Sequence, residues 1–399
     1  MRETRVYSIP MPIRFRGITV RQGMLIRGEA GWGEWSPFEE YGPREAATWL
    51  RAALEAADEG YPEPVRFSIP VNATIPAVDP PTARKLAVGS GCATAKIKVA
   101  EPGQSLDDDI ARVEAVRDGL GPKAKIRVDA NGGWDFDQAE KAVKSLAKYD
   151  LEYVEQPCAA VEDLAKLRRK VDVPIAADES IRRAEDPYLV KKLEAADVAV
   201  LKVQPLGGVR ACLRLAEELD MDVVVSSAVE TSVGLRAGIA LAAALPRLPY
   251  ACGLGTLPLL SADVVSDPLT CVNGQIPVRP VHVDPALVDR VQADEETIRQ
   301  WTVRLDVSRR AALLPWEGDG DPASGRMTEN GGTPPPVILT QSGSPSPDQP
   351  SSRVILTKSG SPSPDQPSSP VILTKSGSPS PNPFITPGSP CPPEEHNNG

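Results

Sequence analysis

The chain has 399 residues, of which 41% are hydrophobic and 25% charged, and its formal net charge is −10. This composition is typical of a soluble globular protein with one large domain or two ordinary ones. The acidic charge argues against a nucleic-acid binder, and no apolar run is long enough to cross a membrane, so we expect neither as a partner.

The number and spacing of cysteines and histidines limit the cellular compartment that we expect and the side chains that can transfer protons. The six cysteines form no CxxC pairs, which indicates neither a zinc site nor a disulfide framework. Together with the lack of a signal-peptide pattern, this predicts a reducing, cytoplasmic location. Because only His282 and His396 are present, an enzyme made of this chain must move protons mainly with Lys, Asp, Glu, Tyr or Cys.

The two flanks of the chain share one pattern. Residues 1–64 read as strands followed by a helix, and residues 262–320 return to strands and a final helix. We expect the two flanks to form one α+β capping domain, and the alternative is two unrelated additions.

Between the flanks, residues 65–261 alternate short β-branched runs with helical patterns. The eight runs cover residues 71–77, 94–100, 125–131, 151–157, 173–179, 198–204, 222–228 and 250–256. Strands that alternate with helices of roughly 10–15 residues form parallel βαβ units. No Gly-rich loop follows the first strand, as an open doubly wound sheet would show. We therefore predict an α/β fold with a (β/α)7β TIM-like barrel whose last helix is absent.

The end of the chain has a different composition. Residues 321–399 are rich in Pro, Ser and Gly, and the segment VILTQSGSPSPDQPSS at 337–352 recurs at 354–369 and in part at 371–383. Such a composition buries too little apolar surface to offset chain ordering, so we predict a disordered tail. It reads either as a docking tail or as a duplicated extension without a function.

Charged residues mark the ends of five consecutive strands of the predicted barrel. In chain order they are Lys96 and Lys98, Asp129 and Asn131, Glu155, Asp178 and Glu179, and Lys202. Catalytic groups of such barrels lie at the carboxyl ends of the strands. Oxygen ligands of this kind suit Mg²⁺ or Mn²⁺, and a dication would relieve the repulsion between the three carboxylates.

These residue types suit proton removal next to a carboxylate. The reaction produces an enediolate dianion, which needs strong positive charge at its two oxygens. A lysine beside another lysine is pushed toward its neutral form and can then act as the base. Lys96 and Lys98 point to the same strand face because the side-chain period is two. Lys202 would lie across the mouth, so we expect the substrate between Lys98 and Lys202.

Several motifs carry a family resemblance over about residues 5–310. AKIKV, VDANGGWD, YVEQP, IAADES and VLKVQPLGGV resemble the strand-end motifs of the enolase superfamily, muconate-lactonizing subgroup. RFRGITVR, GWGEWSPFEEYGP, VNATIPAV, SIRRAEDP and SSAVETSVGL together resemble the actinobacterial group of o-succinylbenzoate synthases.

The resemblance implies a lyase of menaquinone biosynthesis. Its reaction is the Mg²⁺-dependent syn-dehydration of 2-succinyl-6-hydroxy-2,4-cyclohexadiene-1-carboxylate to 2-succinylbenzoate. It implies that Lys98 removes the α-proton and then protonates the leaving hydroxide. Lys96 would support the developing charge, and Lys202 would stabilise the anion or, as in relatives that racemise, act as a second acid and base.

The resemblance also implies ligand and substrate contacts. Asp129, Glu155 and Asp178 would hold the metal, with Asn131 and Glu179 as near neighbours. Further expected substrate contacts are Arg16, in a mobile loop of the capping domain with Gly17 and Ile18, and Ser226, Ser227 and Gly253 at the last two strand ends. Ser226 and Ser227 fit equally well as caps of their strand ends.

Other functions share the predicted site. An N-succinyl- or N-acylamino acid racemase and a muconate cycloisomerase would use the same lysines and carboxylates. A dipeptide epimerase would require acidic residues at the eighth strand end, and ACGLGT has none. A non-enzymatic alternative is an interaction protein that acts through the repetitive tail.

Overall fold

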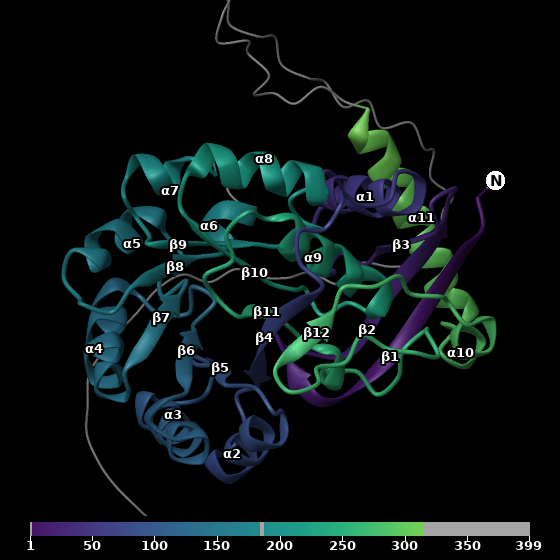
Figure 1. Ribbon diagram of the computed structural model, residues 1–399. Helices are drawn as coiled ribbons and strands as arrows, with labels where there is room; N and C mark the ends of the chain where they lie inside the picture. The colour runs from purple at the N-terminus through teal and green to yellow at the C-terminus, as the bar shows by residue number, and fades with distance from the viewer. Residues whose placement is uncertain (1, 184–186, 314–399) are drawn as a thin grey trace, which may run out of the picture. The chain divides into compact units, whose positions relative to one another are not determined.

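The computed structural model describes residues 2–183 and 187–313 (Figure 1). The predicted disordered tail at 321–399 lies outside the described residues. No helix among those residues is long and apolar enough to cross a membrane.

Eight parallel strands form a barrel in the middle of the chain (Figure 1). They are β4 (Ser68–Ile75), β5 (Thr94–Lys98), β6 (Lys125–Asp129), β7 (Leu151–Glu155), β8 (Ile175–Ala177), β9 (Val198–Leu201), β10 (Asp222–Val225) and β11 (Cys252–Gly255). From β4 to β10 each strand pairs with the next in sequence, and β11 pairs with β4. A single bridge between Ser226 and Gly253 closes the circle between β10 and β11. All eight predicted strands and the barrel are confirmed.

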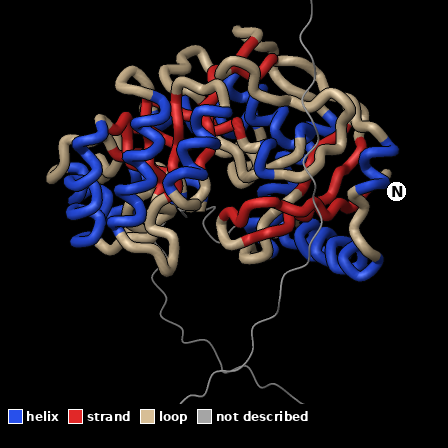
Figure 2. Tube along the Cα trace, turned by 90° about the horizontal axis from the view of Figure 1, so that it is seen from below, coloured by secondary structure: helices blue, strands red, loops and turns tan. Residues whose placement is uncertain are grey.

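Helices connect the strands and cover their outer faces (Figures 1 and 2). They are α2 (Pro80–Gly89), α3 (Leu106–Leu120), α4 (Phe136–Leu146), η1 (Ala147–Tyr149), α5 (Val161–Arg168), α6 (Glu179–Arg182), α7 (Leu189–Lys192), α8 (Val209–Leu219) and α9 (Ser232–Ala244). Local signals begin several of them; for example, Ser105 and Asp108 form a capping box at the start of α3. In the described part of the chain, only the short helix η2 (Leu257–Leu259) follows β11 directly, so no full eighth helix continues the barrel there, as expected.

An N-terminal cap accompanies the barrel. The antiparallel sheet β1 (Thr4–Phe15), β2 (Ile18–Arg27) and β3 (Trp32–Trp35) packs with α1 (Pro43–Asp58). From the C-terminal flank, α11 (Glu295–Ala312) packs against α1 and β1, and α10 (Pro285–Arg290) precedes it. The short strand β12 (Gln275–Pro277) pairs instead with β4 of the barrel. The C-terminal flank therefore contributes to both the cap and the barrel. The domain boundaries that we expected from the sequence remain a prediction.

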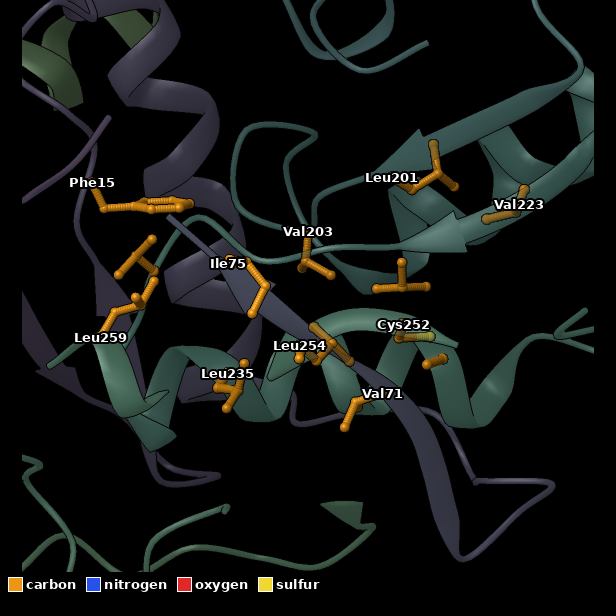
Figure 3. Close-up of a cluster of buried hydrophobic side chains, with 14 of the residues drawn as sticks. Phe15, Val71, Ile75, Leu201, Val203, Val223, Leu235, Cys252, Leu254 and Leu259 are labelled. Carbon is orange, nitrogen blue, oxygen red and sulfur yellow. The ribbon is translucent and has the colours of Figure 1, made fainter. Parts of the chain in front are cut away.

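Apolar side chains join the cap to the mouth of the barrel. Phe15, at the end of β1, belongs to the same buried cluster as Ile75 at the end of β4. Figure 3 shows Phe15 near Leu259 of η2, with Ile75 and Val203 toward the barrel strands. This contact sets the end of the β1–β2 hairpin over the carboxyl ends of the strands, where the predicted site lies.

Candidate active site

Strand register brings three of the predicted site residues into one row. Lys98 of β5 is the pairing partner of Asp129 of β6, and Asp129 is in turn the partner of Glu155 of β7. All three side chains lie at the carboxyl ends of their strands and are at least nine-tenths buried. The row arises because parallel strands of similar length end at the same edge of the sheet.

The lysines and carboxylates form two buried ion-paired groups. Lys98 Nζ lies 2.6 Å from Asp129 Oδ2. Lys96 Nζ lies 3.2 Å from the same oxygen and 2.9 Å from Glu155 Oε1. On the other side, Lys202 Nζ lies 2.6 Å from Asp178 Oδ2. The structure thus brings together all the lysines and carboxylates that the strand-end pattern placed at the mouth.

The protonation of this cluster depends on burial and on neighbouring charges. Burial, and then the charge of Asp129, raise the pKa of Glu155 to about 7. Burial also acts on Asp129, but the ammonium groups of Lys98 and Lys96 outweigh it and hold the Asp129 pKa well below its usual range. Burial, assisted by the charge of Lys96, lowers the pKa of Lys98 despite the opposing effect of Asp129. A lowered pKa is the property that a lysine base requires.

Two residues that we did not single out from the sequence hold Asp178 in place. Arg182 Nε donates to Asp178 Oδ1 at 2.8 Å, and the same guanidinium contacts Glu179 and the Tyr41 hydroxyl of the cap. Gln156 Oε1 accepts the backbone N–H of Asp178 at 2.9 Å. The four-residue spacing from Asp178 to Arg182 was the only local signal of the first contact, because the helix that makes it is a single turn.

The donor set fits a hard divalent cation. Among residues 2–183 and 187–313, no three His, Cys, Asp or Glu side chains are grouped so that they could hold a metal as they stand. Instead, Lys96, Lys98 and Lys202 contact the carboxylates. Asp129 is nevertheless the register partner of Glu155, and Asp178 directly follows β8, so the three carboxylates lie on neighbouring strand ends. Burial, and then repulsion from Asp129, raise the pKa of Glu155. A dication would remove that repulsion, and carboxylate oxygens are the ligands that Mg²⁺ prefers.

The predicted neighbours of the carboxylates lie beside them. Asn131 Oδ1 accepts a hydrogen bond from Lys98, and Asn131 Nδ2 donates to Glu179 Oε1 at 3.2 Å. Glu179 Oε2 is buried without a protein partner. A cavity of about 320 Å³ opens here and is lined in part by Asn131, Glu179 and Arg183.

The last two strand ends are tightly packed. A Cβ added to Gly253 would lie 2.6 Å from Ser226 Oγ and 3.2 Å from Ser226 Cβ, so the two strand ends pack closely at the closing bridge. Ser227 Oγ lies 2.7 Å from Thr256 Oγ1 and accepts the backbone N–H of Val229 at 3.1 Å. These contacts are compatible with a capping role for Ser227, and both this role and a substrate role for the two serines and Gly253 remain predictions.

The tip of the β1–β2 hairpin places Phe15 over Lys98, a contact that we did not predict from the sequence. Arg16, with a φ of 50°, stacks on Phe38 at 4.6 Å and lies 3.7 Å from Glu40. The neighbouring Phe15 ring lies 5.3 Å from Lys98 Nζ. Phe15 is therefore the cap residue that covers the lysine, and a substrate contact by Arg16 remains a prediction.

A buried polar network links the cap to the loop after β10. Glu34 Oε2 accepts backbone N–H groups of Thr231 and Gly234, at 3.2 and 3.1 Å, at the start of α9. Arg21 Nε donates to the carbonyl of Val229 at 2.8 Å, where the backbone has a φ of 63°. A carboxylate at a helix N-terminus is stabilising, and so is a guanidinium that donates to the carbonyl of a residue with a strained backbone. We infer that the cap holds this loop in shape.

The network also contains a second buried carboxyl group that is incompletely hydrogen-bonded. Glu230 is buried beside Glu34, and its Oε2 has no partner. Burial, and then the charge of Glu34, raise its pKa to about 7, although Arg21 opposes this. The folded protein therefore keeps the Glu230 proton to a higher pH than the unfolded chain, so its stability falls as pH rises from about 5 to 8.

Glu230→Gln is expected to remove this pH-dependent loss. Relative to the unchanged chain, the variant should gain on the order of 3 kcal/mol of unfolding free energy at pH 8 and much less at pH 5. Urea unfolding at both pH values measures the difference, with the exposed Glu217→Gln as a control that should show none. An equal gain at both pH values would contradict the assignment.

Comparison with known proteins identifies the family. Residues 6–57 match the Enolase N-terminal domain-like family and residues 81–282 the Enolase C-terminal domain-like family. The chain is similar to o-succinylbenzoate synthase of Thermobifida fusca, with 62% identity over 78% of this chain and 96% of that protein. The same enzyme of Mycolicibacterium smegmatis is 54% identical over 75% of this chain and 92% of its own length.

Solved structures show the same fold at lower identity. Muconate lactonizing enzyme from Pseudomonas fluorescens, 22% identical, superposes with a TM-score of 0.65 over 73% of this chain and 98% of that chain. The L-Ala-D/L-Glu epimerase from Bacillus subtilis, 22% identical, gives 0.61 over 71% and 96%. With its cap, its barrel and these relatives, the chain belongs to the o-succinylbenzoate synthases of the enolase superfamily.

Proposed function

We propose that the chain catalyses the syn-dehydration of 2-succinyl-6-hydroxy-2,4-cyclohexadiene-1-carboxylate to 2-succinylbenzoate, a hydro-lyase step of menaquinone biosynthesis. The observation that carries the proposal is the pair of lysines on opposite sides of one carboxylate row. Lys98 forms an ion pair with Asp129, Lys202 forms one with Asp178, and both lysines are buried. The 62% identity to a named o-succinylbenzoate synthase supports the choice of reaction.

Asp129, Glu155 and Asp178 are the residues that would hold Mg²⁺, with Mn²⁺ as a substitute. When bound, the cation supplies positive charge for the carboxylate oxygens of the substrate. Support for this ligand set comes from the hard oxygen donors, their burial and the raised pKa of Glu155, which is caused by burial and then by repulsion from Asp129. Arg182 and Gln156 would orient Asp178 for that role.

Lys98 carries both proton transfers in this proposal. Its neutral amine takes the proton from the carbon next to the substrate carboxylate and becomes an ammonium. The C–O bond then breaks, and the same ammonium returns its proton to the departing hydroxide, which leaves as water. One lysine suffices because the proton and the hydroxide leave from the same face, and the product gains aromatic stability. The lowered pKa of Lys98 and the lid formed by Phe15 support this role.

Lys96 and Lys202 act through their charge. Burial alone would lower the pKa of Lys96, but Glu155 and Asp129 outweigh it and raise that pKa, so Lys96 stays an ammonium. Lys202 lies on the far carboxylate and would stabilise the anion from the other face. Because two lysines from opposite faces could also exchange an α-proton, racemisation of an N-succinylamino acid is a second candidate activity.

Activity of the purified chain tests the proposal. With Mg²⁺, we expect conversion of the cyclohexadiene to 2-succinylbenzoate, followed by the rise of aromatic absorbance and by mass spectrometry. EDTA should reduce the rate by at least about 10³-fold, and added Mg²⁺ should restore it, because the anion would otherwise lack its counter-charge.

A parallel assay separates the two candidates. Incubation of an N-succinylamino acid in D₂O reports α-proton exchange by NMR. Exchange without dehydration would replace the first candidate with the second, and absence of both reactions would overturn the proposal. For the location we propose the cytoplasm, supported by free thiols at all five described cysteines.

A further inference from the structure

Two cysteines far from the lysine cluster lie against each other. Cys92 Sγ and Cys271 Sγ are 3.5 Å apart, although the residues are 179 positions apart in sequence. Both sulfurs also face the carbonyl of Ser90, at 3.8 and 3.9 Å. Cys92 precedes β5 at the amino end of the barrel, and Cys271 precedes β12.

The backbone on both sides is held in place. Asn273 and Gly274 have φ values of 50° and 74°, and Val272 and Gln275 exchange two hydrogen bonds of 2.8 and 3.0 Å around them. This is the pattern of a tight two-residue hairpin turn that fixes the chain next to Cys271. The Gly274 carbonyl accepts the N–H of Val71 in β4 at 2.9 Å, and a Cβ on Gly274 would lie 3.7 Å from the Cys92 Cα. The two thiols therefore face each other across a rigid contact.

We propose that Cys92 and Cys271 are an oxidation site, at which a small-molecule disulfide converts the two thiols into an internal disulfide bond. Only a short approach of the sulfurs is required, because the segments that carry them are already in contact. Within the described residues, the sulfurs of Cys158, Cys212 and Cys252 are buried and face backbone carbonyls rather than another sulfur. The site is independent of the dehydratase proposal.

The chemistry proceeds by two exchange steps. Cys271 is partly exposed, so its thiolate attacks one sulfur of the small disulfide and releases one thiolate. The Cys92 thiolate then attacks Cys271 Sγ in the mixed disulfide and releases the second. The protons of the two cysteines pass to the two released thiols, so two thiols are oxidised and one disulfide is reduced. Burial raises the pKa of Cys92 to about 12, so the partly exposed Cys271 makes the first attack, and Cys92 reacts only once its sulfur lies beside the mixed disulfide.

The test is oxidation of the full chain with glutathione disulfide. Intact-mass analysis should show a loss of about 2 Da without a retained adduct, and non-reducing peptide mapping should find the Cys92–Cys271 cross-link. The oxidised chain should melt about 5 °C higher than the reduced chain, because the bond closes a long loop. Dithiothreitol should reverse both changes.

Matched variants keep the result specific. Cys391→Ser should still form the cross-link, whereas Cys92→Ser and Cys271→Ser should each prevent both the mass loss and the shift in melting temperature. If Cys92→Ser fails to fold, Cys271→Ser, at the partly exposed position, gives the same answer. Three results would each overturn the proposal. Cys92 and Cys271 could both remain free thiols after oxidation, a glutathione adduct could persist on Cys271, or either cysteine could be cross-linked to a different one.

Discussion

Replacing Lys98 with alanine is expected to lower kcat by at least about 10³-fold while the fold and the Mg²⁺ response remain. The loss follows because Lys98 would carry both proton transfers, whereas Glu155 and Asp129 outweigh burial and keep its strand neighbour Lys96 protonated. The fold should persist because Asp129 keeps Lys96 as a partner at 3.2 Å. Product formation measures the first effect, and melting temperature with and without Mg²⁺ measures the second.

Two further variants separate proton transfer from charge. Lys98→Arg keeps the positive charge, but a guanidinium does not give up its proton at neutral pH, so this variant should be as inactive as the alanine variant. Lys85→Ala, at an exposed position of α2, should retain full activity. If Lys98→Arg works at more than a tenth of the normal rate, the base lies elsewhere.

Replacing Glu155 with glutamine is expected to weaken Mg²⁺ binding by about 100-fold or more and to reduce turnover in parallel. The change conserves shape but removes the charge of the carboxylate that lies between Asp129 and Asp178 in strand order, with which Lys96 pairs at 2.9 Å. Loss of a direct ligand should exceed the 10–100-fold cost of losing a residue that only orients a ligand. Calorimetric titration with Mg²⁺ measures the affinity directly.

The control for Glu155 is a carboxylate outside the cluster. Glu162 is exposed at the start of α5, soon after the strand that carries Glu155, so Glu162→Gln should leave affinity and turnover unchanged. High Mg²⁺ concentration should partly restore Glu155→Gln if its defect is one of binding. Unchanged Mg²⁺ affinity in Glu155→Gln would remove this residue from the ligand set.

Much of the site could be predicted because the positions of its residues follow from short segments of the sequence. A strand places alternate residues on one face, so the spacing of Lys96 and Lys98 predicted that both enter the barrel, and both are buried there. Parallel strands that follow one another in sequence pair with their neighbours, so Asp129 and Glu155 had to be adjacent. The order of charged strand ends was therefore sufficient to predict the cluster.

The cap contacts could not be predicted in the same way. Which residue of the sequence Phe15-Arg16 would cover Lys98 depends on the turn of the hairpin and on packing against Ile75 and η2. The C-terminal flank was expected to return to the cap, but β12 pairs with β4 because the tight turn at 272–275 brings it to that strand. Neither the contact of Phe15 with Lys98 nor the pairing of β12 with β4 is indicated by a periodic pattern in the sequence.

By itself, the sequence determined the barrel, the row of carboxylates and the lysines on either side, because side-chain periodicity and strand order are properties of short segments. The tertiary structure decided the rest. Glu34 reaches α9 across 197 residues, and Cys92 reaches Cys271 across 179. Such contacts depend on how whole layers pack, and packing is settled by the summed burial of many side chains rather than by any local pattern.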